Sequence, residues 1–144
     1  MTPSDKHTTI LLAEDQDGLR YAVATHLRRE GYHVEAIHGL DALQRGRDYF
    51  GPIDVLVTDL TMPHLTGRAV ADGLRVQRPQ LPVLFLTGEP VESLSDGLGP
   101  MTEYLPKPYE LADVALKIRE LLRSGSEGRS VMCGTSASVF HRVA

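Results

Sequence analysis

Five short apolar segments, separated by stretches with helical spacing, restrict this chain to a small set of folds. The segments are residues 9–13, 33–37, 53–57, 82–86 and 102–105, and each has the length and composition of a β-strand. Three of the five are apolar almost throughout instead of alternating with polar residues. A parallel strand that is covered by helices on both faces has this pattern. We therefore expect those three strands at the centre of a sheet.

The stretches between the strands have apolar residues at helical spacing. Leu19, Val23 and Leu27 precede Gly31 in the first, and a similar series runs through the last. Alternating strands and helices predict right-handed crossovers, because parallel neighbours cannot be joined by a tight hairpin. We expect an α/β fold with an open, doubly wound, five-stranded parallel sheet and helices on both faces. In such sheets the functional residues gather at the carboxyl ends of the strands.

Polar residues stand at the ends of four predicted strands. The ends are Glu14-Asp15 after the first strand, Thr58-Asp59 after the third, Thr87-Gly88 after the fourth and Pro106-Lys107-Pro108 after the fifth. Three carboxylates at one sheet edge would raise one another's pKa unless a cation were present. Mg2+ prefers oxygen ligands and is commonly held by one or two carboxylates together with a phosphoryl oxygen. The pattern predicts phosphoryl transfer, with Asp59 as nucleophile and with Thr87 and Lys107 contacting phosphoryl oxygens.

Charge and composition exclude several other classes of function. The 15 basic and 19 acidic side chains give a net charge of -4, which argues against direct binding to nucleic acid. No run approaches the ~18 apolar residues of a membrane span, and the N-terminus has no apolar targeting segment. A single cysteine, Cys133, fits a reducing compartment. We expect a cytoplasmic protein without a membrane partner.

Four segments, each at a predicted strand end, together resemble the receiver domain of two-component response regulators. They are Glu14-Asp15, the stretch 59–67 that begins with Asp59 and ends with Gly67, Leu86-Thr87-Gly88, and Tyr104-Leu105-Pro106-Lys107-Pro108. The resemblance covers residues 8–123. It implies a flavodoxin-like strand order of 2-1-3-4-5 and a bacterial signalling switch that is not an enzyme.

The resemblance also implies a role for each matching residue. Asp59 would accept a phosphoryl group from a histidine kinase or a phosphotransfer protein. Glu14, Asp15, Asp59 and the backbone carbonyl of Thr61 would hold Mg2+, with Glu14 acting through a metal-bound water. Lys107 would contact the phosphoryl group, and Thr87 and Tyr104 would form the switch pair. Gly67 would permit the start of the third helix, and Pro108 would follow Lys107 through a cis peptide bond.

Simpler interpretations of single residues, and two other functions, stay open at this stage. Asp15 is also suited to cap the following helix, and Tyr104 to be a half-buried core aromatic. A degenerate receiver that binds partners without phosphate is one alternative function. A haloacid-dehalogenase-like phosphohydrolase is another, although such enzymes need a second Asp two positions after the nucleophile, where this chain has Thr61.

One region departs from the family pattern, and both ends of the chain lie outside the resemblance. Glycines and prolines between Gly88 and Pro100 predict a short or irregular fourth helix, and in this family that helix belongs to the partner face. Residues 1–7 form an N-terminal extension, and residues 124–144 have the composition of a flexible tail that holds no output domain. The chain is then either a single-domain regulator or the receiver of a hybrid kinase. The sequence leaves its kinase, its downstream partner and homodimerisation open.

Overall fold

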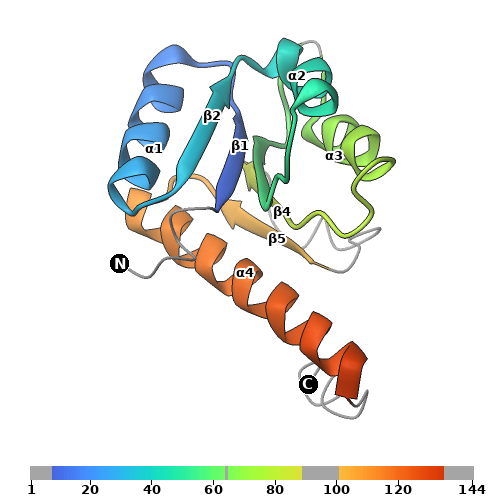
Figure 1. Ribbon diagram of the computed structural model, residues 1–144. Coiled ribbons are helices and arrows are strands. Elements are labelled where there is room, and N and C mark those ends of the chain that lie inside the picture. Colours follow the sequence, from blue (N-terminus) through green and yellow to red (C-terminus); the bar gives the residue numbers. More distant parts are fainter. Residues whose placement is uncertain (1–7, 64, 89–100, 135–144) are drawn as a thin grey trace.

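A computed structural model describes residues 8–63, 65–88 and 101–134 of the chain. Its elements in chain order are β1 (Thr9–Ala13), α1 (Asp17–Arg29), β2 (His33–Ile37), the 3-10 helix η2 (Gly39–Asp41), α2 (Ala42–Asp48), β3 (Val55–Asp59), α3 (Gly67–Arg75), β4 (Val83–Thr87), β5 (Thr102–Pro106) and α4 (Leu111–Gly134). The five strands are parallel and lie in the order β2-β1-β3-β4-β5. The predicted fold class and strand order are therefore confirmed (Figure 1).

The three central strands are β1, β3 and β4, and every one of their residues is buried. The outer strands β2 and β5 are only partly buried. The centre of the sheet thus consists of the continuously apolar segments, as their composition predicted.

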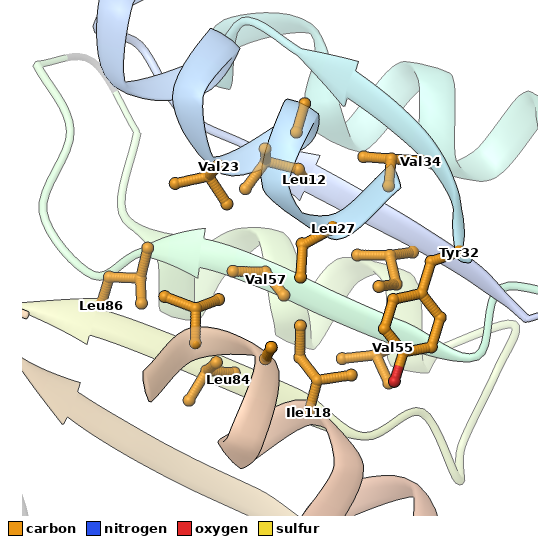
Figure 2. Packing of buried hydrophobic residues seen from close by; sticks show 14 of the residues in the cluster. Leu12, Val23, Leu27, Tyr32, Val34, Val55, Val57, Leu84, Leu86 and Ile118 are labelled. Carbon is orange, nitrogen blue, oxygen red and sulfur yellow. The ribbon is translucent and has the colours of Figure 1, made fainter. Parts of the chain in front are cut away.

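Two hydrophobic cores lie on opposite faces of the sheet, because successive side chains of a strand point to opposite sides. In β1, Ile10 and Leu12 belong to the first core, while Leu11 and Ala13 belong to the second. The first core joins the sheet to α1 and α4, and Figure 2 shows Leu12, Leu27 and Ile118 converging there. The second core joins the sheet to α2 and α3. Figure 1 shows these two pairs of helices on either side of the sheet.

The third and fourth strands begin later than their apolar segments suggested. Strand β3 begins at Val55, and the preceding Asp54 is bonded to β1, where its carboxylate accepts a 2.7 Å hydrogen bond from the backbone N–H of Thr9. Ile53 precedes the strand and is buried in the second core. Strand β4 begins at Val83, after Pro82, which has no N–H to donate to a sheet ladder.

Helix α4 is longer than the sequence suggested, because it continues past Arg123 to Gly134. The flexible tail was predicted to begin at residue 124. Serine and glycine lower helix propensity without forbidding a helix, and no proline follows Pro108 in the sequence. Of the tail, residues 135–144 lie outside the described part of the chain, as do residues 89–100, where the irregular fourth helix was predicted. Among the described helices, none is both long and apolar enough to span a membrane.

Candidate functional site

The carboxyl ends of four strands meet at one edge of the sheet. The register places Ala13 of β1 beside Thr58 of β3, and Thr87 of β4 beside Pro106 of β5. The contact between β4 and β5 continues past the sheet, where the backbone N–H of Lys107 donates a 2.7 Å hydrogen bond to the carbonyl of Thr87. The polar residues that follow these strands are therefore held at the same edge.

Three carboxylates form the centre of this edge. One oxygen each from Glu14, Asp15 and Asp59 lie within 4.8 Å of one another. Glu14 is fully buried and Asp59 is 2% exposed, whereas Asp15 is half-buried. The position before α1 that caps the helix belongs to Gln16, whose side chain makes no capping hydrogen bond, so the capping interpretation of Asp15 is wrong.

Burial and the neighbouring Asp59 make Glu14 a weak acid. Its pKa is raised from 4.5 to about 8, chiefly by burial, and further by a hydrogen bond to Asp59 and by the charge of that carboxylate. The backbone N–H of Gln16, which donates a 3.1 Å hydrogen bond to Glu14 Oε2, and the charge of Lys107 oppose the rise. Without a further cation, Glu14 thus holds its proton near neutral pH.

Lys107 places a positive charge beside Asp59. Its Nζ lies 3.2 Å from Asp59 Oδ1, and its side chain is 32% exposed. The two groups attract each other by charge, but they are not aligned for a hydrogen bond. Among the described residues, Asp59 Oδ1 and Glu14 Oε1 are therefore both buried oxygens that no donor satisfies. Buried oxygens of this kind are costly. A hard divalent cation would satisfy them, so the donor set fits Mg2+.

The loop after Asp59 folds back and brings α3 close to the end of β3. Thr61 and Thr66 form an isolated antiparallel bridge, and Thr66 Oγ1 caps α3 by accepting a 3.1 Å hydrogen bond from the N–H of Ala69. The Gly67 N–H donates a 2.8 Å hydrogen bond to the carbonyl of Leu60. A Cβ atom at Gly67 would overlap the backbone carbonyl of Asp59, so glycine is required here by close approach.

Thr87 and Tyr104 are both buried, at 2% and 7% exposure. Thr87 ends β4, whereas Tyr104 lies within β5 and faces the second core. The Tyr104 ring stacks on Phe85, its partner in the register between β4 and β5, with the ring centroids 5.4 Å apart. Its hydroxyl accepts a 3.3 Å hydrogen bond from the guanidinium of Arg68 on α3.

The fifth strand is followed by a cis peptide bond between Lys107 and Pro108, the isomer that the resemblance implied. The next residue, Tyr109, is a site neighbour that the sequence did not reveal. Its hydroxyl is buried without a hydrogen-bond partner among the described residues. Burial, then the charges of Glu14 and Asp59, raise its pKa. In the sequence, a tyrosine after a strand is typical of an ordinary core aromatic, so no pattern indicated that Tyr109 lies beside the site.

Comparisons of the sequence and of the structure with known proteins point to the same family. The sequence model of the family described as response regulator receiver domain matches residues 10–119. The sensor kinase CckA of Brucella abortus is 32% identical over 117 residues, which cover 79% of this chain and 12% of that protein. The chain spans about half, or less, of the length of the curated relatives it matches.

Solved structures agree with this. A response regulator receiver protein from Sinorhizobium medicae shares 28% identity with a TM-score of 0.74, over 83% of this chain and 98% of that one. Response regulator protein TrrA from Thermotoga maritima, in complex with Mg2+-BeF, shares 26% identity with a TM-score of 0.68, over 80% of this chain and 99% of that one. Both share their fold with most of this chain.

Proposed function

Because this chain belongs to the response regulator receiver family, we propose that it is the phosphoacceptor switch of a two-component system, with Asp59 as the acceptor. One observation supports this above all: the buried Asp59 carboxylate lies among two other carboxylates, with the Lys107 ammonium 3.2 Å away. Receiver domains are signalling domains and not typical enzymes. A buried carboxylate with a cation and a metal-binding group beside it has the parts that phosphoryl transfer needs.

In the proposed step, a carboxylate oxygen of Asp59 attacks the phosphorus of a phosphohistidine on a histidine kinase or phosphotransfer protein. The new oxygen–phosphorus bond forms as the phosphorus–nitrogen bond breaks, and the imidazole leaves with the electron pair and takes up a proton. Lys107 holds the negative charge of the phosphoryl oxygens, and the buried Thr87 hydroxyl donates a hydrogen bond to one of them.

Glu14, Asp15, Asp59 and the backbone carbonyl of Thr61 would hold Mg2+, Glu14 through a water molecule. The ion would neutralise carboxylate and phosphoryl charge while the group is transferred. The grouping of the three carboxylates supports this assignment, as does the Mg2+-BeF complex of the related TrrA.

Thr87 and Tyr104 form the proposed switch. The Thr87 hydroxyl moves toward the phosphoryl group, and the Tyr104 ring occupies the inward position beside Phe85. The changed positions of Thr87 and Tyr104 alter the surface near β5. A downstream protein would bind at this surface, or a second copy of the chain would pair there. Neither nucleic acid nor a membrane is a proposed partner.

The receiver unit is proposed to span residues 8–123, with residues 1–7 and 124–144 as extensions. It acts in the cytoplasm, as a single-domain regulator or as part of a hybrid kinase. The kinship with CckA suits the second arrangement, and the described fold suits both.

Intact-protein mass spectrometry tests the phosphoacceptor assignment. The purified chain is incubated with Mg2+ and acetyl phosphate or phosphoramidate, beside the variants Asp59→Asn and Asp48→Asn. Asp48 is an exposed aspartate at the end of α2 and serves as the matched control. Addition of one phosphoryl group to the wild type and to Asp48→Asn alone is the expected result. No adduct on the wild type, together with no beryllofluoride binding, would overturn the proposal in favour of a degenerate receiver.

A further inference from the structure

Arg68 connects the start of α3 to the ring of Tyr104. It is the second residue of α3, and its guanidinium Nη2 donates a 3.3 Å hydrogen bond to the Tyr104 hydroxyl across 36 positions of sequence. The arginine is half-buried, while Tyr104 is 7% exposed and stacks on Phe85. The contact thus fixes the polar end of a ring whose body is already packed.

The same turn of α3 also touches the proposed phosphoacceptor. Gly67, the residue before Arg68, approaches the backbone carbonyl of Asp59 so closely that no Cβ fits between them. Its N–H is bonded to the carbonyl of Leu60 at 2.8 Å. The first turn of α3 therefore contacts the backbone of Asp59 through Gly67 and the Tyr104 hydroxyl through Arg68.

The chemistry of the pair favours the buried position of the ring. A tyrosine that turns inward must take its hydroxyl out of water, which costs free energy unless that hydroxyl is hydrogen-bonded. A guanidinium is always charged, and its hydrogen bonds to neutral groups are stronger than those between two neutral groups. Arg68 supplies such a donor at the point where the buried hydroxyl lies.

We propose that Arg68 is a positioning residue that holds Tyr104 inward before any phosphoryl group is bound. This inference rests on the proposed role of Tyr104 as a switch residue. Arg68 raises the ratio of inward to outward Tyr104 by about tenfold, the effect of one moderate hydrogen bond to a charged donor. The resting protein is then biased toward the conformation that phosphorylation selects.

The ratio is measurable by 19F NMR on protein carrying 3-fluorotyrosine, without Mg2+ or a phosphoryl donor. The Tyr104 resonance is assigned from the variant Tyr104→Phe. Arg68→Met removes the donors and keeps a similar aliphatic length, and Arg47→Met makes the same change at an exposed position on α2. The expected result is a drop of about tenfold in the inward-to-outward ratio for Arg68→Met, with Arg47→Met unchanged. Arg68→Lys, which keeps a charged donor, should recover part of the ratio.

A double-mutant cycle in urea gives a second readout that does not depend on resolving two resonances. If Arg68 and Tyr104 interact as proposed, the effects of Arg68→Met and Tyr104→Phe on the unfolding equilibrium will be non-additive, by several-fold and up to about tenfold. An unchanged Tyr104 ratio in Arg68→Met, or additive effects in the cycle, would overturn the inference. If Arg68→Met does not fold, Arg68→Gln replaces it in both experiments.

The two proposals fail separately. A wild-type protein that takes up no phosphoryl group would remove the proposed function, while the Tyr104 ratio would still report on Arg68. A protein that is phosphorylated normally but whose Tyr104 ratio ignores Arg68 would remove only the inference.

Discussion

The variant Glu14→Gln should change how the stability of the metal-free protein depends on pH. Glu14 is fully buried, and its pKa is raised from 4.5 to about 8 by burial and then by Asp59. Below pH 4.5 the carboxyl group is protonated in the folded and unfolded states alike, so stability is complete. Between pH 4.5 and 8 the unfolded chain releases this proton and the folded chain keeps it, so the free energy of unfolding falls. Above pH 8 the loss is complete.

The size of this loss follows from the two pKa values. At roughly 1.4 kcal/mol for each pH unit, the interval from 4.5 to about 8 corresponds to at most about 5 kcal/mol. Solvent reaches the site past half-buried Asp15 and past Lys107, whose side chain is 32% exposed, and screens part of the effect. We expect a loss of about 2–5 kcal/mol in the wild type. Glutamine cannot ionise, so Glu14→Gln should remove most of this pH-dependent loss of stability.

Urea unfolding at pH 5, 6.5 and 8 in the presence of EDTA measures the effect. The comparison uses wild type, Glu14→Gln and Glu110→Gln, the last being an exposed glutamate before α4. Titrating groups that do not interact with the substituted residue are common to the compared proteins and cancel in the differences. Equal pH slopes for wild type and Glu14→Gln would refute the reasoning, since burial would then impose no penalty on the carboxylate. Added Mg2+ should flatten the wild-type slope, because the ion favours the deprotonated carboxylate.

Three further variants test the surroundings of the site. Gly67→Ala should lower the free energy of unfolding in urea by about 2 kcal/mol, since its methyl group would overlap the Asp59 carbonyl. Gly18→Ala is the control and should not destabilise the fold, because Gly18 has open space around it. Equal stabilities of the wild type and Gly67→Ala would contradict the close packing. Lys107→Met should slow phosphorylation by acetyl phosphate about 100-fold by losing a preorganised charge. Lys117→Met is its control, because that side chain is equally exposed at 32%, and an unaffected rate in Lys107→Met would exclude a role in transfer. Tyr109→Phe should leave stability unchanged or raise it by about 1 kcal/mol, because it removes a buried hydroxyl without a partner among the described residues; a clear loss in calorimetry would mean that the hydroxyl is bonded.

Much of the fold could be predicted because the sheet depends on local patterns. Apolar segments of strand length predicted β1 and β2 at their observed bounds, and the sheet edge followed from the polar residues after each strand. Strand β3 was predicted to begin too early because Ile53 is an apolar residue that is buried in the second core without being part of the strand. Helix α4 was predicted to end too early. The serines and glycines after Arg123 have low helix propensity, but low propensity does not by itself end a helix.

The site could be predicted only as far as strand ends define it. Glu14, Asp15 and Asp59 come together because parallel strands end at the same edge. Arg68 and Tyr109 could not be found in this way. The contact of Arg68 with Tyr104 spans 36 positions and depends on how α3 packs, and the burial of the Tyr109 hydroxyl depends on the chain after β5.

The division of the interior into two cores separates the residues that pack with Tyr104 from those that do not. Tyr104 packs in the second core with Phe85, Val70 and Met62, whereas the next residue, Leu105, packs in the first core. Under the proposed switch, a change in the position of the Tyr104 ring would therefore alter packing beneath α2 and α3 and leave the layer beneath α1 and α4 unchanged. Under the same proposal, the second core would respond to activation and the first core would not. In hydrogen exchange, amides of α3 would respond to activation while those of α1 would serve as an internal standard.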